Sequence, residues 1–93
     1  MAIPKAQITV FVMKGCGACT AFKPLLKGVA ARFPQVPLQV LDIDKNVPLA
    51  SKLKINATPT TVMTHYKGDV RKLVGAVDEA TLTRAFTAVA RVL

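Results

Sequence analysis

The chain's two cysteines, Cys16 and Cys19, are separated only by Gly17 and Ala18. Two thiols at this spacing can form and break a disulfide with each other, with a thiolate as the attacking group. A disulfide kept only for stability is disfavoured, because so short a loop barely constrains the unfolded chain. Small secreted domains that depend on disulfides also use more cysteines, spaced more widely. The pair is therefore predicted to be chemical rather than structural.

A Cys-x-x-Cys pair can also be half of a zinc site. Such a site needs two further Cys or His ligands, and His65 is the chain's only histidine. The sequence therefore predicts no metal site. His65 is expected to be a surface residue near the end of a strand.

The cysteine pair stands between a predicted strand, 8–13, and a predicted helix that Pro34 ends. The strand is β-branched and apolar, which suits the centre of a sheet. The helix has apolar residues at helical spacing: Cys19, Phe22, Leu25, Leu26, Val29, Ala30 and Phe33. Pro24 lies inside the helix and is expected to kink it.

The start of a helix presents free N–H groups and partial positive charge, which stabilise a thiolate. We therefore expect the pKa of Cys16 to be lowered and Cys16 to be the exposed, attacking sulfur. Cys19, one helical turn further, is the expected resolving thiol. Gly17 would leave the Cys16 sulfur uncovered. Lys14 either adds positive charge near this sulfur or is an ordinary surface lysine.

The remaining pattern predicts strands at 38–42, 60–66 and 70–74, with a hairpin turn at 67–69. A short helix through Leu53 is predicted with Asn46 as its cap, and Asp78 is predicted to cap the last helix. The order is β-α-β-α-β-β-α. It predicts one α/β domain over residues 1–93, a four-stranded mixed sheet flanked by three helices on both faces, with the first two strands parallel.

The composition describes a basic globular protein of 93 residues, with 13 Lys and Arg against 5 Asp and Glu and a net charge of +8. The basic residues are scattered, which favours a solvated surface; steering toward acidic proteins or an anionic thiol is the alternative. Nucleic-acid binding is disfavoured, because aromatic residues make up only 5%. No stretch approaches the roughly 18 apolar residues of a membrane span, and no secretory signal is visible. We expect a cytoplasmic monomer.

Three features at characteristic spacing resemble the thioredoxin superfamily, over nearly the whole chain. They are Cys16-Gly17-Ala18-Cys19 with Pro24 five residues later, Ala57-Thr58-Pro59-Thr60, and Lys67-Gly68-Asp69-Val70 leading to Val74-Gly75-Ala76. The resemblance implies a thioredoxin-like fold and a thiol–disulfide oxidoreductase. It implies that Pro59 is cis and lies against the sulfurs, with the Thr58 backbone free to pair with a substrate segment. The implied substrate-binding residues are Gly17, Ala18, Thr58, Pro59 and Gly75.

Two departures from thioredoxins concern the surroundings of the cysteines. Val10 stands where thioredoxins carry a buried aspartate, so deprotonation of Cys19 is expected to fall to water or to the departing thiolate. Gly15 replaces the usual tryptophan. Thioredoxins also begin with an extra strand and helix that this sequence lacks, so its size is closer to that of glutaredoxins.

A partial resemblance to glutaredoxins leaves the electron source open. Gly75-Ala76-Val77-Asp78 is similar to their glutathione-binding stretch, and Lys14 could meet a glutathione carboxylate. The expected function is a reducing donor to protein disulfides, with a thioredoxin-type reductase or glutathione as electron source. No cofactor is expected beyond the redox-active disulfide and glutathione as a candidate co-substrate. The alternatives are a thioredoxin-fold binding module without redox turnover and, from charge alone, a nucleic-acid-associated redox protein.

Overall fold

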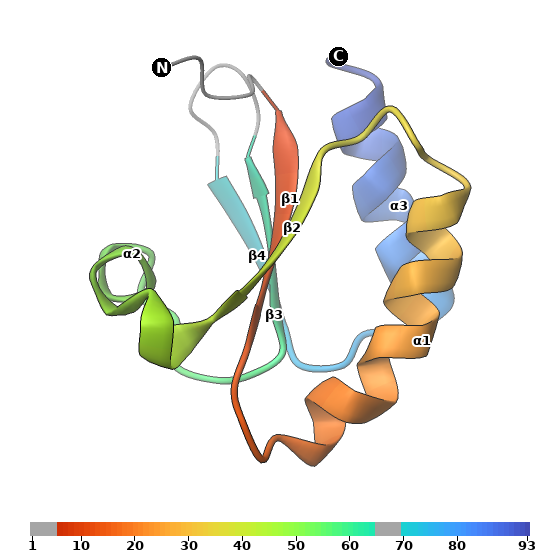
Figure 1. The fold of residues 1–93 in the computed structure, drawn as a ribbon. Coiled ribbons are helices and arrows are strands. Elements are labelled where there is room, and N and C mark those ends of the chain that lie inside the picture. Colours follow the sequence, from red (N-terminus) through yellow and green to blue (C-terminus); the bar gives the residue numbers. More distant parts are fainter. Residues whose placement is uncertain (1–5, 65–69) are drawn as a thin grey trace.

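The computed structural model describes residues 6–64 and 70–93, and within them four strands form one mixed sheet (Figure 1). The elements are β1 (Gln7–Val12), α1 (Gly17–Ala31), β2 (Leu38–Asp42), a 3₁₀ turn (Ile43–Lys45), α2 (Val47–Lys52), β3 (Thr60–Thr64), β4 (Val70–Val74) and α3 (Glu79–Ala90). The strand order is β2-β1-β3-β4. Strand β1 runs parallel to β2 and antiparallel to β3, and β4 runs antiparallel to β3.

Strand β1 lies at the centre of the sheet, as its apolar sequence predicts. Successive side chains of a strand point to opposite faces. Ile8 and Val10 accordingly join the larger core, beneath α1 and α3, whereas Phe11 joins a smaller core with Ala50 of α2 and Val62 of β3. The strand that leads into the cysteine pair is thus held by apolar contacts on both sides.

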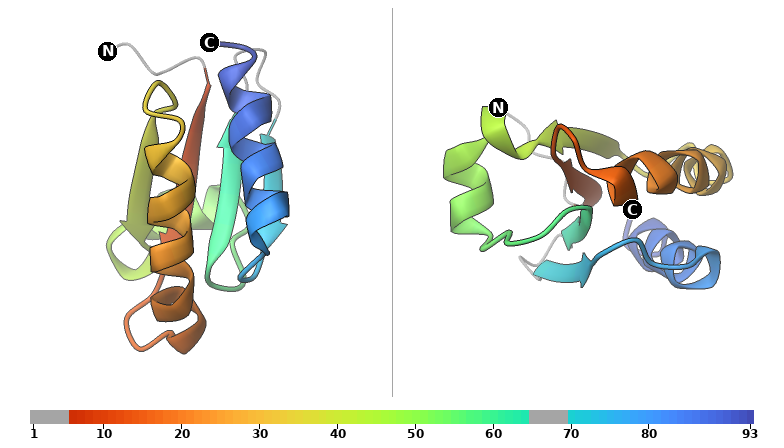
Figure 2. Two further views of the ribbon diagram at one scale, coloured as in Figure 1. Left: turned by 90° about the vertical axis from the view of Figure 1, so that its right-hand side faces the viewer. Right: turned by 90° about the horizontal axis from the view of Figure 1, so that it is seen from below.

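The helices lie on both faces of the sheet, as predicted. Helices α1 and α3 cover one face side by side, and α2 lies against the other (Figures 1 and 2). The rings of Phe33 and Phe86 pack across the α1–α3 side with centroids 5.7 Å apart. The buried residues of α1 are the predicted apolar stripe: Cys19, Phe22, Leu26 and Val29. The thioredoxin-like α/β fold is therefore confirmed.

The structure corrects some local details. Helix α1 contains Pro24 but ends at Ala31, before Pro34. A 3₁₀ turn that was not predicted follows β2. Asn46 is the N-cap residue of α2, as predicted, but its side chain donates to the Asp42 carbonyl at 2.9 Å and makes no capping hydrogen bond. The Asp78 cap is confirmed, since its carboxylate accepts from the Thr81 backbone N–H at 2.8 Å. The predicted hairpin turn 67–69 and His65 lie outside the described residues.

Helices long and apolar enough to cross a bilayer are not found in the parts of the chain that the structure describes.

Candidate active site

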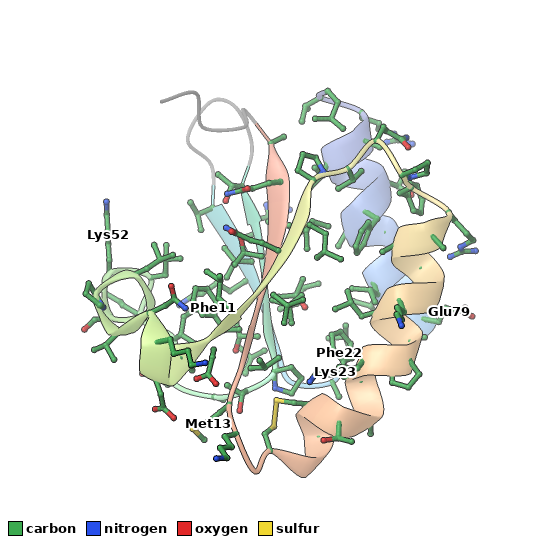
Figure 3. All side chains as sticks on the ribbon, in the orientation of Figure 1. Phe11, Met13, Phe22, Lys23, Lys52 and Glu79 are labelled. Atoms are coloured by element: carbon green, nitrogen blue, oxygen red, sulfur yellow. A yellow bond between two sulfur atoms is a disulfide. The ribbon has the colours of Figure 1, made fainter. Side chains whose placement is uncertain are left out.

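Cys16 and Cys19 are joined by a disulfide at the start of α1, and their Cα atoms are 5.2 Å apart. Figure 3 shows this bond at the lower end of the molecule, below Phe22 and beside Met13. Cys16 is the N-cap residue of the helix, and its Sγ accepts a hydrogen bond from the Cys19 backbone N–H at 3.1 Å. The first sulfur therefore occupies a position where an anion would be stabilised by the helix start.

A tight turn between β1 and α1 delivers Cys16 to this position. The Cys16 N–H donates to the Met13 carbonyl at 3.2 Å, and Gly15 within the turn has φ +80°. Only glycine adopts this left-handed conformation without steric cost. From the sequence, Gly15 is recognised only as the residue that replaces the usual tryptophan. The sharp break from a strand pattern into a helix was the signal that could have assigned it this role.

The two sulfurs differ in exposure. Cys19 is 3% exposed and belongs to the buried stripe of α1, whereas Cys16 is half-buried and its neighbours Gly17 and Ala18 are exposed. A partner molecule approaching this end of the protein therefore meets Cys16 before Cys19.

The loop before β3 lies against Cys16. The carbonyl oxygen of Thr58 is 3.5 Å from the Cys16 Sγ. The Thr58–Pro59 peptide bond is cis, as the resemblance implied, and Pro59 is buried. Gly75, at φ +89°, donates its N–H to the Pro59 carbonyl at 2.8 Å. Three segments far apart in the sequence, which carry most of the predicted site residues, thus meet at one end of the sheet.

Two side chains that the sequence reasoning missed hold this loop in place. The hydroxyl of Thr60 donates to the Ala57 carbonyl at 2.6 Å, within the loop itself. The ammonium group of Lys72 on β4 donates to the carbonyls of Leu53 and Lys54, at 3.1 and 3.3 Å. The Lys72 contacts join residues that are 18 and 19 positions apart, and no local sequence pattern signals them, whereas the Thr60 contact spans only three residues.

The remaining candidates are a buried apolar residue, an exposed lysine and a carboxylate that caps a helix. Val10 is fully buried in the larger core, so an apolar side chain occupies the position of the family's aspartate. Lys14 is exposed on the turn before Cys16. The Asp78 carboxylate is engaged at the start of α3, where hydrogen bonds from the Thr81 hydroxyl and backbone N–H lower its pKa. Over residues 6–64 and 70–93, no group of three or more His, Cys, Asp or Glu side chains could hold a metal ion.

The family model for thioredoxin matches residues 3–88. The chain belongs to the thioredoxin family. It is 30% identical over 73 residues to a thioredoxin of Chlamydia pneumoniae, covering 78% of this chain and 72% of that protein. It is 29% identical over 72 residues to thioredoxin-1 of Saccharomyces cerevisiae, covering 77% and 70%. The solved structure of Fasciola hepatica thioredoxin superposes with a TM-score of 0.80 at 27% identity, covering 90% of this chain and 80% of that one.

Membership in the thioredoxin family assigns a redox role to the Cys16–Cys19 disulfide. This thioredoxin-family protein is a thiol–disulfide oxidoreductase, and its Cys-x-x-Cys pair is present in the disulfide form. Thioredoxins work through such a redox-active disulfide without a prosthetic cofactor. Proteins of the family act with disulfide substrates and reductases.

Proposed function

We propose that this protein is an electron donor that reduces disulfides in other proteins, with Cys16 as the nucleophile and Cys19 as the resolving thiol. The observation that carries the proposal is the placement of the Cys16 Sγ at the N-cap of α1, where it accepts the Cys19 N–H at 3.1 Å. In the reduced protein the same N–H and the helix dipole stabilise a thiolate on Cys16. We therefore expect the pKa of the Cys16 thiol to lie below that of a free cysteine.

The reaction proceeds by two exchanges. The Cys16 thiolate attacks one sulfur of the substrate disulfide, that bond breaks, and the released substrate thiolate takes up a proton. Cys19 then loses its proton and attacks the Cys16 sulfur of the mixed disulfide, which releases the second substrate thiol. Two electrons have passed to the substrate, whose two sulfurs take up the proton lost by Cys19 and one proton from solvent. The Cys16–Cys19 bond of the structure is the product on the protein.

Substrate docking is assigned to the surface around Cys16. The Thr58 backbone, beside the sulfur, is the edge to which an extended substrate segment adds as a strand. Gly17 and Ala18 present little bulk next to it, and Pro59 and Gly75 fix the loop from behind. The exposed Lys14 adds positive charge at the mouth of the site.

An insulin-reduction assay with dithiothreitol tests the roles of the two thiols. Cys16→Ser should abolish the accelerated reduction, because the attacking sulfur is lost. Cys19→Ser should accumulate a mixed disulfide between Cys16 and the substrate, visible by non-reducing mass spectrometry. Full turnover by Cys16→Ser, or adducts trapped on Cys19 in place of Cys16, would refute the assignment.

The electron source is the open part of the proposal, and two donors fit: a thioredoxin-type reductase with its reduced nicotinamide cofactor, or glutathione. Both are offered in parallel to the oxidised protein, and formation of free thiols identifies the donor. We further propose that residues 1–93 act as one monomeric domain in the cytoplasm, a compartment that keeps a reducing dithiol supplied with electrons. Sedimentation at working concentration tests the monomer.

A further inference from the structure

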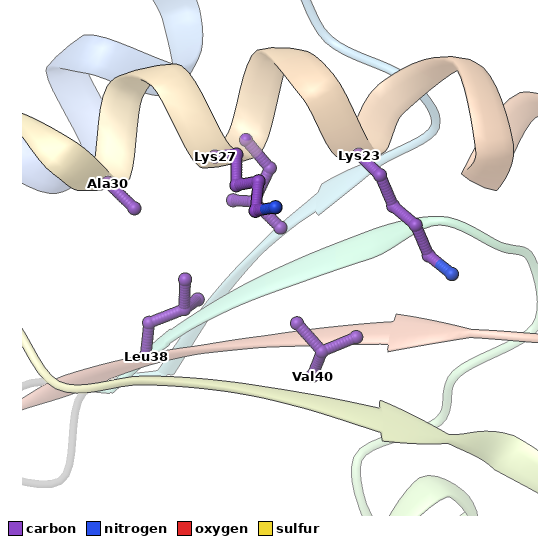
Figure 4. A pocket seen from close by; sticks show the side chains of 6 residues that line it. Lys23, Lys27, Ala30, Leu38 and Val40 are labelled. Atoms are coloured by element: carbon purple, nitrogen blue, oxygen red, sulfur yellow. The ribbon is translucent and has the colours of Figure 1, made fainter.

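A groove of about 420 Å³ runs between α1 and β2, on the side of the sheet edge (Figure 4). Its lining is mostly apolar: Leu26, Ala30, Leu38 and Val40, together with the stems of Lys23 and Lys27. Val40 is 45% exposed although it lies on a strand, on the face that packs toward α1. The groove is therefore apolar surface that the larger core leaves uncovered.

Strand β2 is the edge of the sheet, because the strand order begins with it and only β1 pairs with it within the described residues. An edge strand presents N–H and C=O groups to solvent, a ready template for another extended segment. A segment added there would lie about 4.8 Å from β2, and alternate side chains would face the groove. The groove and the edge are thus one continuous surface for an added strand.

The charge at this surface is positive. Helix α1 contains Lys23 and Lys27 and no acidic residue. Strand β2 ends at Asp42, but this residue does not line the groove, and its carboxylate accepts from the Asp44 backbone N–H at 2.8 Å. Like charges four residues apart on a helix repel each other, so an acidic group placed between them is favourable. Figure 4 shows both side chains extending from α1 over the groove toward β2. A second copy of this chain is a poor occupant, since each copy carries +8.

The spacing of the two lysines matches an added strand. Four residues of helix rise by about 6 Å, and two residues of strand span about 6.6 Å. Acidic side chains two positions apart on an extended segment can therefore each meet one lysine, while apolar side chains further along meet Ala30 and Leu38. An antiparallel segment places the acidic residues first, because β2 runs from Leu38 toward Val40 and α1 runs the opposite way.

We propose that this groove binds an extended, acidic segment of a partner protein, which adds as an antiparallel strand to β2 and pairs its carboxylates with Lys23 and Lys27. The surface lies outside the cysteine site, so the inference does not depend on the redox function. It gives the basic charge of this protein a specific role in the choice of partner.

The test uses the capped peptide Glu-Thr-Glu-Thr-Val-Thr-Val, whose alternate residues carry the acidic and apolar groups. The backbone amide chemical shifts of the ¹⁵N-labelled, oxidised protein are followed by NMR at low salt as the peptide is added. We expect saturable shifts centred on β2 and the facing side of α1. Reversing both charges, Lys23→Glu with Lys27→Glu, should weaken binding about tenfold or more.

The matched control reverses two exposed lysines elsewhere, Lys45→Glu with Lys52→Glu, which lowers the net charge equally. Figure 3 shows Lys52 pointing away from the sheet on α2. This variant should retain the affinity within about twofold, and Val40→Glu should lose binding while keeping normal insulin reduction, because it removes an apolar contact and repels the acidic peptide. If both double variants weakened peptide binding equally, the peptide would be attracted by net charge alone, and the proposal would be overturned. An absence of saturable shifts, or self-association of the wild type through β2, would also overturn it.

Discussion

Thr60 and Thr61 are neighbours on β3, and their hydroxyls differ in whether they make a hydrogen bond. Both side chains are buried, at 1% and 0% exposure. The Thr60 hydroxyl donates to the Ala57 carbonyl at 2.6 Å, whereas the Thr61 hydroxyl has no hydrogen-bond partner among the residues that the structure describes. The sheet register places Thr61 between Val10 and Leu73, two apolar neighbours. The same substitution to valine should therefore have opposite effects at the two positions.

The expected magnitudes follow from these contacts. A buried hydroxyl without a partner costs about 1–3 kcal/mol, so Thr61→Val should raise the free energy of unfolding by about 1 kcal/mol or more. Thr60→Val removes a made hydrogen bond and should lower it by about 1 kcal/mol. For a domain of this size each kcal/mol corresponds to a change of about 4–8 °C in Tm.

Urea unfolding of the oxidised protein, followed by circular dichroism, measures both variants against the wild type. An unchanged m-value would show that the midpoint shifts report stability rather than altered compactness. The reasoning is refuted if both substitutions shift the midpoint in the same direction, or if Thr61→Val destabilises, since its hydroxyl would then be satisfied.

Three further perturbations test other parts of the account by the same unfolding measurement. Gly15→Ala should destabilise the protein by about 1–2 kcal/mol, because the φ of residue 15 is +80°. Gly28→Ala should stabilise it by up to about 1 kcal/mol, because Gly28 lies within α1 with open space around it. Equal effects of the two substitutions would contradict the place of Gly15 in the turn. Phe86→Ala should cost about 3–5 kcal/mol, and a loss under about 1 kcal/mol would contradict its place in the core. Asp78 has a pKa lowered from 3.8, so its stabilisation is present above that value and lost as the pH falls through its folded-state pKa. The stability difference between wild type and Asp78→Ala should accordingly shrink in acid, and a constant difference would contradict the cap.

The sequence predicted those features of the fold that are encoded in local hydrophobic patterns. The apolar run before the cysteines became β1, and the stripe through Phe22 and Leu26 became the buried face of α1. The antiparallel pairing of β1 with β3 was not predicted, because the two strands are separated by almost 50 residues and no turn links them. The side chain of Asn46 was misassigned because the 3₁₀ turn brings the Asp42 carbonyl within its reach, an option that a capping preference ignores.

The parts of the candidate site that lie within single sequence motifs could be predicted. The Cys16–Cys19 pair and the Thr58–Pro59 loop could be named from the sequence, and the structure brings them within 3.5 Å. The contacts that support them are tertiary: Gly75 to Pro59, and Lys72 to the loop after α2. Each such hydrogen bond contributes only about 1 kcal/mol to stability, and no residue pattern in the sequence indicates it.

The acidity of Cys16 tests the central claim most directly. In the Cys19→Ser variant, which keeps the backbone N–H of residue 19, Cys16 is the only thiol, and its ionisation can be followed by thiolate absorbance in the ultraviolet as the pH is varied. We expect a pKa for Cys16 clearly below that of glutathione titrated alongside. A pKa for Cys16 equal to or above that of glutathione would contradict it.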